Sequence, residues 1–331
     1  MPDIHTNWQA LHGRHFVGAN VLVTGGAGFI GSHVVEALVT LGAKVRVIDD
    51  LSGGDPRNWQ GFESGVQFTQ ASILDRDAVT HAAAGCRYVF HLAALGSVPR
   101  SVEQPDLYTQ VNILGTQHVL EAARGGGAQR VMFSASSSAY GDTPTLPKVE
   151  SMPPDPRSPY AASKVAGEAL MQAWARSYGL DTASLRYFNI FGPRQNANSA
   201  YAAVIAAFAK ALIAGEPCTI FGDGEQSRDF TFVHNAVHAN LLAARADHPL
   251  EGQPINVACG LRVSVNQLEA LMRKQLAPDA PTPRHLPERA GDVKHSLAEL
   301  TLARTTLGYA PIVAFEPGLA ATAAWYQHQP R

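Results

Sequence analysis

Charge of one sign, cysteine and long apolar runs are all scarce in this sequence of 331 residues. Lys and Arg number 26 against 28 Asp and Glu, which gives a formal net charge of −2. A nucleic acid or a membrane surface would favour a basic excess, so we expect neither as a partner. The most apolar stretch, residues 200–209, stops at Lys210 and is too short to span a bilayer.

The three cysteines are Cys86, Cys218 and Cys259, which are scattered and lack any spacing typical of metal ligands. An odd number also argues against a disulfide framework. We therefore expect buried thiols in a reducing compartment and no metal site. The first twenty residues mix polar and aromatic side chains, which is not typical of a signal peptide, so a cytoplasmic protein is expected.

Short β-branched runs alternate with amphipathic stretches from residue 20 onwards. This rhythm is typical of βαβ units and predicts an α/β fold, a Rossmann-type doubly wound parallel sheet. Strands are expected at 21–24, 44–48, 66–70, 88–92, 130–134 and 182–186, and the main helices at 30–41, 103–124 and 160–178.

Turn residues multiply after about Gly192, and the regular alternation loosens. A helix at 233–245 and an apolar run at 255–258 indicate a return to the sheet. We therefore predict a first domain from residues 18–190 plus 232–258, and a smaller C-terminal α/β lobe from 191–231 plus 259–331. Residues 1–18 are expected to be an N-terminal addition, in part helical.

Three glycines, Gly25, Gly28 and Gly31, lie between the first strand and its helix, which Phe29 and Ile30 open. In that context they allow a tight turn and a close backbone approach to a pyrophosphate, whose charge the helix N-terminus favours. The second strand ends at Asp49 and Asp50, and a carboxylate there binds ribose hydroxyls and repels a 2′-phosphate. Although Arg57 lies nearby, the carboxylates favour NAD over NADP, and the first domain is predicted to bind NAD.

Tyr160 and Lys164 open a predicted helix one turn apart, and therefore on one face. We expect the ammonium of Lys164, together with the positive nicotinamide ring, to lower the pKa of the Tyr160 phenol from its ordinary value of about 10. Tyr160 then becomes a general base. The run of serines at 136–138 follows a strand, and Ser136 is the candidate to orient the reacting hydroxyl.

These motifs, with Arg-Tyr-Phe-Asn at 186–189, resemble the extended short-chain dehydrogenase family of sugar-nucleotide epimerases and dehydratases. The resemblance runs from about residue 20 to the C-terminus. Within it, residues 91–101 and 291–296 resemble the bacterial UDP-N-acetylglucosamine 4-epimerases. The C-terminal lobe is then expected to bind a UDP-sugar.

The resemblance implies further NAD contacts at Ser72, Ile73, Leu92, Ala93, Ala94 and Asn112. One of them departs from the family, which usually has Gly-Asp where this chain has Ala71-Ser72. A neutral hydroxyl is a weaker acceptor than a carboxylate, so we expect the adenine to be held less tightly.

The substrate contacts implied by the resemblance lie in six parts of the chain. Asn189, Arg228 and Arg289 are expected on the diphosphate and Asp292 on the nucleoside ribose, without a secure distinction between uridine and thymidine. Gly96 and Ser97 resemble the group that prefers acetylated sugars. The remaining expected contacts are Ser136, Ser137, Ser138, Tyr160 and Ser296.

The reaction is inferred partly by exclusion. Dehydratases of this family carry an acidic residue just after the catalytic hydroxyl residue, and the matching positions here are Ser137 and Ser138. Epimerases confined to non-acetylated sugars tend to place a bulky aromatic where this chain has Ser296, whose small side chain leaves space for an N-acetyl group. The resemblance therefore implies interconversion of UDP-GlcNAc and UDP-GalNAc through a transient 4-keto sugar.

Three other readings stay open at this point. A UDP-glucose or UDP-uronate 4-epimerase would keep the same catalytic residues. A dehydratase or reductase is disfavoured by the missing carboxylates and by Asp49, and a non-catalytic NAD-binding protein by Ser136, Tyr160 and Lys164. The family also commonly forms homodimers through a four-helix bundle, expected here from residues 103–124 and 160–178.

Overall fold

A seven-stranded parallel sheet forms the centre of the computed structural model, which describes residues 4–197, 203–288 and 294–328. The strand order is β3-β2-β1-β4-β5-β6-β11. The strands are β1 (Asn20–Thr24), β2 (Lys44–Asp49), β3 (Val66–Gln70), β4 (Tyr88–His91), β5 (Arg130–Ser136), β6 (Asp181–Tyr187) and β11 (Pro254–Val257). The predicted doubly wound α/β class is confirmed, and the strand ends differ from the expected ones by up to two residues.

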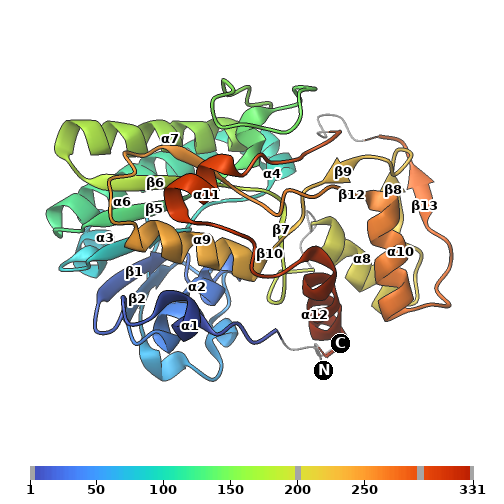
Figure 1. Cartoon of the computed structure of the whole chain (residues 1–331), viewed down its shortest axis with the longest axis horizontal. Coiled ribbons are helices and arrows are strands. Elements are labelled where there is room, and N and C mark those ends of the chain that lie inside the picture. The colour runs from blue at the N-terminus through green and yellow to red at the C-terminus, as the bar shows by residue number, and fades with distance from the viewer. Residues whose placement is uncertain (1–3, 198–202, 289–293, 329–331) are drawn as a thin grey trace.

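Alternate residues of the strands enter two different cores. On β1, Val21 and Val23 pack into the core that holds Val34 of α2 (Phe29–Thr40) and Ala236 of α9 (Val233–Arg245). Leu22 between them packs into the core on the other side, with helices α3 (Arg76–Ala83), α6 (Gly115–Gly125) and α7 (Pro159–Tyr178). Helices therefore cover both faces of the sheet, as Figure 1 shows.

The helix expected at 103–124 is not continuous, which corrects the prediction. The segment instead holds α4 (Val98–Glu103), α5 (Pro105–Tyr108), a π-helix (Thr109–Leu114) and then α6. Pro105 lacks a backbone donor and follows Gln104, whose extended φ of −133° ends α4. The π-helix widens the next turn, a feature that is frequent at functional sites.

A second group of elements lies to one side of the sheet (Figure 1). Described residues between Phe191 and Val233 and between Val263 and Tyr326 form its hydrophobic core. Its elements are β7 (Ile190–Phe191), α8 (Val204–Ile213), β8 (Thr219–Phe221), β9 (Ser227–Arg228), β10 (Thr231–Phe232), β12 (Val263–Ser264), α10 (Val265–Leu276), β13 (Arg284–Leu286) and α12 (Phe315–Gln327). The division of the chain into two domains at the expected residues stays a prediction. Residues 298–309, with α11 (Thr301–Leu307), pack instead into the main core.

Three short 3-10 turns complete the fold: Pro56–Trp59, Glu63–Gly65 and Ser137–Tyr140. Within the described ranges, no helix is both long and apolar enough to cross a bilayer. In the same part of the chain, no three His, Cys, Asp or Glu side chains are grouped so as to hold a metal ion.

The N-terminal addition contains one short helix, α1 (Trp8–His12), and docks on the main core near α2 and α9. Trp8, His12 and Phe16 are buried there. His12 Nε2 lies 3.1 Å from Nδ1 of His238, and Thr6 Oγ1 lies 2.8 Å from Nδ1 of His234. The addition is thus held to α9 largely through histidines.

Burial keeps the two paired rings neutral. It lowers the pKa of His12 to about 3 and that of His238 to about 4, with further lowering by nearby positive charge, including Arg245. In the unfolded chain a histidine titrates near about 6.5. Stability from these neutral rings is therefore present above that pH and is lost as the pH falls towards the folded values.

We expect the free energy of unfolding to fall by on the order of 2 kcal/mol per ring between neutral pH and about pH 5. Urea unfolding at both pH values measures this difference. Replacing both rings, His12→Gln with His238→Gln, should remove their share of the pH dependence and leave the share of the buried His33 and His91, whose pKa values burial also lowers. His81→Gln on the exposed end of α3 should leave the whole pH dependence intact. An unchanged slope in the double variant would contradict the assignment.

Candidate active site

The glycine turn after β1 is shaped by close packing against the loop that follows β4. Gly25 has a φ of +69°, and a Cβ there would lie 2.6 Å from the amide nitrogen of Ala93. A Cβ on Gly31 would lie 2.0 Å from the carbonyl oxygen of Gly25. Larger residues are therefore excluded at both positions by the chain itself.

Helix α2 begins after this turn with Gly28 as its N-cap, and no side chain caps it. Its first N–H groups, including those of Phe29 and Ile30, are thus available to an anion. This arrangement fits a dinucleotide, whose pyrophosphate would lie at the start of α2. Bound NAD would supply a hydride acceptor at the carboxyl edge of the sheet.

Asp49 ends β2, and its carboxylate is buried. Its Oδ2 accepts from the amide of Ala27 at 3.0 Å and its Oδ1 from the amide of Leu51 at 2.8 Å. Burial raises the pKa of this carboxyl, and the two backbone bonds oppose the rise. Each oxygen keeps a second lone pair for a ribose hydroxyl. Asp50 is exposed and accepts from the amide of Ser52 at 2.9 Å.

The other expected cofactor contacts follow β3 and β4. Ser72 caps its own turn, since its Oγ accepts from the amide of Leu74 at 3.2 Å. The side chain of Ile73 is buried against Gly115, and its carbonyl oxygen lies 3.2 Å from Nδ1 of His118. Leu92, Ala93 and Ala94 are half-buried in the loop after β4. Asn112 is buried and bonded to that loop rather than open to a cofactor.

Ser136 and Tyr160 meet at the end of β5. The Oγ of Ser136 accepts from the amide of Ser138 at 3.2 Å and from the Ser138 hydroxyl at 2.9 Å. The Ser136 hydroxyl also lowers the pKa of the Tyr160 phenol, which places the two groups next to each other. Ser137 is half-buried beside them.

The chain by itself raises the pKa of Tyr160, so the lowering expected from Lys164 together with the nicotinamide ring stays a prediction. Burial of the phenol causes the rise, and the bond from Ser136 opposes it. Lys164 donates instead to the carbonyl oxygen of Ser134 at 2.8 Å, and its Nζ lies 5.0 Å from the centre of the Phe133 ring. Burial lowers the pKa of Lys164 to about 7, partly offset by Glu168.

Three expected substrate residues lie close together in the second lobe. The side-chain amide of Asn189 donates to Oγ of Ser296 at 3.2 Å. The backbone of Asn189 has a φ of +38°. The backbone amide of Ser296 donates to the carbonyl oxygen of Ser227, the residue before Arg228. Arg228 donates to the carbonyl oxygens of Ser227 and Lys294, each at 3.1 Å. Ser296 is buried, while Arg289 and Asp292 lie outside the described residues.

Gly96 and Ser97 lie in the loop after β4. Gly96 is exposed, and a Cβ there would meet no other atom within 4 Å. The Ser97 hydroxyl caps α4 by accepting from the amide of Arg100 at 3.2 Å. The chain therefore does not itself require a glycine at position 96.

Sequence reasoning missed three residues that shape the site. Asp229 is buried beside Arg228 and accepts from the amides of Cys259 and Gly260, each at 3.0 Å. Ser163 donates to the carbonyl of Tyr160 at 2.8 Å, and its spacing within the motif of Tyr160 and Lys164 was a usable signal. Tyr108 packs against Tyr160, and nothing in the sequence pattern indicated it.

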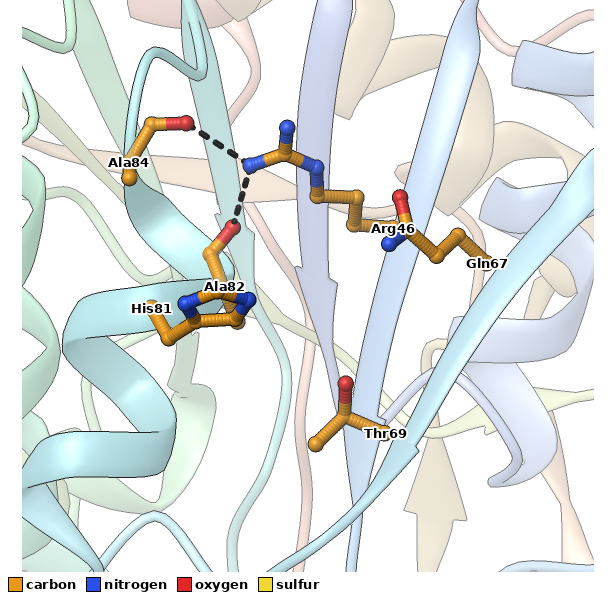
Figure 2. Close-up of a pocket in the computed structure, with 6 residues that line it drawn as sticks. All are labelled: Arg46, Gln67, Thr69, His81, Ala82 and Ala84. Atoms are coloured by element: carbon orange, nitrogen blue, oxygen red, sulfur yellow. Dashed lines mark hydrogen bonds between the residues drawn. The ribbon is translucent and has the colours of Figure 1, made fainter.

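A hollow at the free edge of the sheet is separate from this site (Figure 2). It lies between β2, β3 and the end of α3, and Arg46 lies beside it. Arg46 donates to the carbonyl oxygens of Ala82 at 3.2 Å and Ala84 at 2.7 Å, and so closes the C-terminal end of α3. The hollow therefore lies where the end of α3 packs against the edge of the sheet.

Comparisons with known proteins agree with this geometry. Residues 21–258 match the NAD dependent epimerase/dehydratase family. The UDP-glucose 4-epimerase of Mycolicibacterium smegmatis is 40% identical, over 93% of this chain and 98% of that protein.

Two solved structures are also similar. One is the UDP-N-acetylglucosamine 4-epimerase of Methanobrevibacter ruminantium in complex with UDP-N-acetylmuramic acid, at 42% identity and a TM-score of 0.89, covering 94% of this chain and 98% of that one. The other is the UDP-glucose 4-epimerase of Thermus thermophilus in complex with NAD, at 35% identity and a TM-score of 0.84, covering 93% and 99%.

These relatives are UDP-sugar 4-epimerases, which confirms the expected enzyme class and NAD as the cofactor. The resemblance drawn from the glycine turn and from Tyr160 and Lys164 is confirmed with them. The chain belongs to the NAD dependent epimerase/dehydratase family.

Proposed function

We propose that this enzyme interconverts UDP-N-acetylglucosamine and UDP-N-acetylgalactosamine through a 4-keto sugar. The observation that carries the choice of substrate is the small, buried Ser296 bonded to Asn189. The position beside the predicted diphosphate contact, Asn189, is thus occupied by a small side chain. The open space at Gly96 supports the same choice, as does the similarity to the epimerase from M. ruminantium.

The residues of the site fit a proton-transfer role. Tyr160 would take the proton of the C4 hydroxyl, and Ser136, which lies beside the phenol, would orient that hydroxyl. Asn189 and Arg228 would hold the diphosphate while the keto sugar turns over. The hydride would pass from C4 to bound NAD and back to the opposite face, and Tyr160 would return the proton to the 4-keto oxygen. Ser137 and Ser138 supply hydroxyls and not the carboxylate that elimination requires.

UDP-glucose is the second candidate substrate, because two of the similar proteins are UDP-glucose 4-epimerases. The two candidates differ only in the group on C2 of the sugar. The choice therefore depends on the space near Ser296 and Gly96 and not on Tyr160 or Lys164.

The purified enzyme should convert UDP-GlcNAc to UDP-GalNAc with a higher kcat/KM than it shows for UDP-glucose. Chromatographic separation of the epimers measures both. Tyr160→Phe should lower kcat by roughly 10²–10⁴-fold, because it removes the general base. Tyr178→Phe, at the exposed end of the same helix, is the matched control. Equal or better turnover of UDP-glucose would overturn the choice of substrate.

Enlarging residue 296 should separate the two substrates. We expect Ser296→Tyr to lower kcat/KM for UDP-GlcNAc by at least about tenfold relative to UDP-glucose, because one steric conflict of this kind is worth about 1–3 kcal/mol. Ser296→Ala removes the same hydroxyl without adding bulk and should affect both substrates alike. If Ser296→Tyr lowers both values in parallel, Ser296 does not select the C2 group.

A homodimer is proposed through the face formed by α4, the π-helix, α6 and α7. Three of the seven large hydrophobic residues that are exposed in the described part of the chain lie on α4 and the π-helix: Val98, Val102 and Leu114. Exposed apolar side chains on neighbouring elements are typical of an interface. The three unpaired cysteines support a reducing, cytoplasmic setting.

Val102→Asp combined with Leu114→Asp should convert the dimer to a monomer in light scattering after size exclusion. The reason is that both side chains would place a charge in an apolar contact. Val17→Asp introduces the same charge at an exposed site on the N-terminal segment and should leave the dimer intact. A wild-type monomer, or a double variant that stays dimeric, would refute this interface.

A further inference from the structure

The loop after β4, residues 92–97, carries predicted contacts to both the cofactor and the sugar. Its first residue, Leu92, still donates to the carbonyl oxygen of Thr24 on β1, but β4 ends before the loop and α4 begins only after it. Its shape therefore depends on side chains that bond to its backbone. Two such side chains, Tyr108 and Asn112, come from α5 and the π-helix.

Asn112 and Tyr108 each bind both backbone groups of one loop residue. Asn112 accepts from the amide of Leu95 at 2.9 Å and donates to its carbonyl oxygen at 3.1 Å. The Tyr108 hydroxyl accepts from the amide of Ser97 at 3.1 Å and donates to its carbonyl oxygen at 2.7 Å. Both side chains are buried, so water does not compete for these bonds.

The same two side chains also contact the catalytic helix. The ring of Tyr108 stands perpendicular to that of Tyr160, at 89°, with the ring centres 6.5 Å apart. Asn112 donates to Oγ of Ser163 at 3.0 Å, and Ser163 donates to the carbonyl oxygen of Tyr160 at 2.8 Å. One ring contact and one chain of hydrogen bonds thus join the loop to Tyr160.

We propose that Tyr108 is a positioning residue that sets the distance between the sugar-binding loop and the phenol of Tyr160. Its hydroxyl fixes Ser97, and its ring limits the rotation of the Tyr160 ring. Asn112 holds a nearby residue of the loop, Leu95, in the same way. The inference rests on the proposed function, because it assigns Tyr160 to the proton transfer and Ser97 to the sugar.

The size of the effect follows from what the hydroxyl does. Removing it leaves the amide and the carbonyl of Ser97 without their partner, which loosens the loop while the ring packing stays. A displacement of about 1 Å between reacting groups lowers a rate by roughly 10²-fold. The diphosphate contacts proposed at Asn189 and Arg228 lie on other elements, so nucleotide binding should not change.

Tyr108→Phe tests the proposal, because it removes the hydroxyl alone. We expect kcat to fall by about 10- to 100-fold for whichever UDP-sugar the wild type turns over. The inhibition constant of UDP should stay within about twofold of the wild type. Amide hydrogen exchange should speed up in the peptide that contains residues 95–97. Tyr178→Phe, again the matched control, should change none of the three.

The readouts separate a positioning role from a general loss of structure. A lower kcat with weaker UDP binding and a lowered melting temperature would make Tyr108 a stability residue and overturn the proposal. So would an unchanged kcat, or unchanged exchange at 95–97. A wild type active only on UDP-glucose would overturn the proposed substrate and leave this test intact. A wild type without any epimerase activity would overturn both.

Discussion

A buried line of hydrogen bonds through His91 holds together the segments that carry the site. Thr24 Oγ1 lies 2.7 Å from Nδ1 of His91, and Nε2 lies 2.9 Å from Oγ1 of Thr116. Because Thr116 gives its own proton to the carbonyl of Asn112, the imidazole must donate through Nε2 and accept through Nδ1. Burial, with Lys164 nearby, lowers the pKa of His91 to about 3 and keeps the ring neutral in this arrangement. Thr24 directly precedes the glycine turn and also accepts from the amide of Ala93. One neutral ring therefore joins the cofactor turn, the loop after β4 and the π-helix.

Burial also shifts the pKa values of Tyr160 and Lys164, the two residues expected to take part in proton transfer. It raises the pKa of Tyr160 and lowers that of Lys164 to about 7, so both groups are driven towards their uncharged forms. Glu168, one turn after Lys164, offsets this only in part, because both of its oxygens are bonded to Arg186 at 2.8 and 2.7 Å. Tyr160 loses its proton readily only when positive charge lies close to the phenol. The Ser136 hydroxyl is the polar contact that the chain provides there. The site is thus arranged so that the positive nicotinamide ring of the cofactor, rather than Lys164 alone, would make Tyr160 a base.

The sequence predicts those parts of the molecule that depend on local pattern. The glycine turn, the carboxylates at the end of β2 and the pair of Tyr160 and Lys164 follow from spacing between a strand and a helix, and helix α9 was predicted at its observed bounds. The break at Gln104–Pro105 was visible as a proline, but the apolar periodicity around it obscured the break. Tyr108 gave no signal, since its partners Ser97 and Tyr160 are set by the π-helix and not by spacing. The pairing of His12 with His238 joins residues 226 positions apart, which no periodicity reports. Burial, which the sequence does not show, raises the pKa of Tyr160 in the chain itself, so the predicted lowering depends on the cofactor.

The residues proposed to select the sugar are anchored independently of those proposed to transfer the proton. Asp229 lies buried between Arg228 and Phe230 and accepts from the amides of Cys259, Gly260 and Ala298. It therefore ties β9 to the segment after β11 and to the chain just after Ser296. Ser296 in turn accepts from the amide of Asp229 at 3.3 Å, which fixes its side chain relative to Asn189. None of these bonds involves Tyr160, Lys164 or Ser136. A change of side chain at position 296 can thus alter the space for the group on C2 while the proton-transfer residues keep their places. This separation explains how similar UDP-sugar 4-epimerases can share one catalytic arrangement and still differ in the sugar they accept.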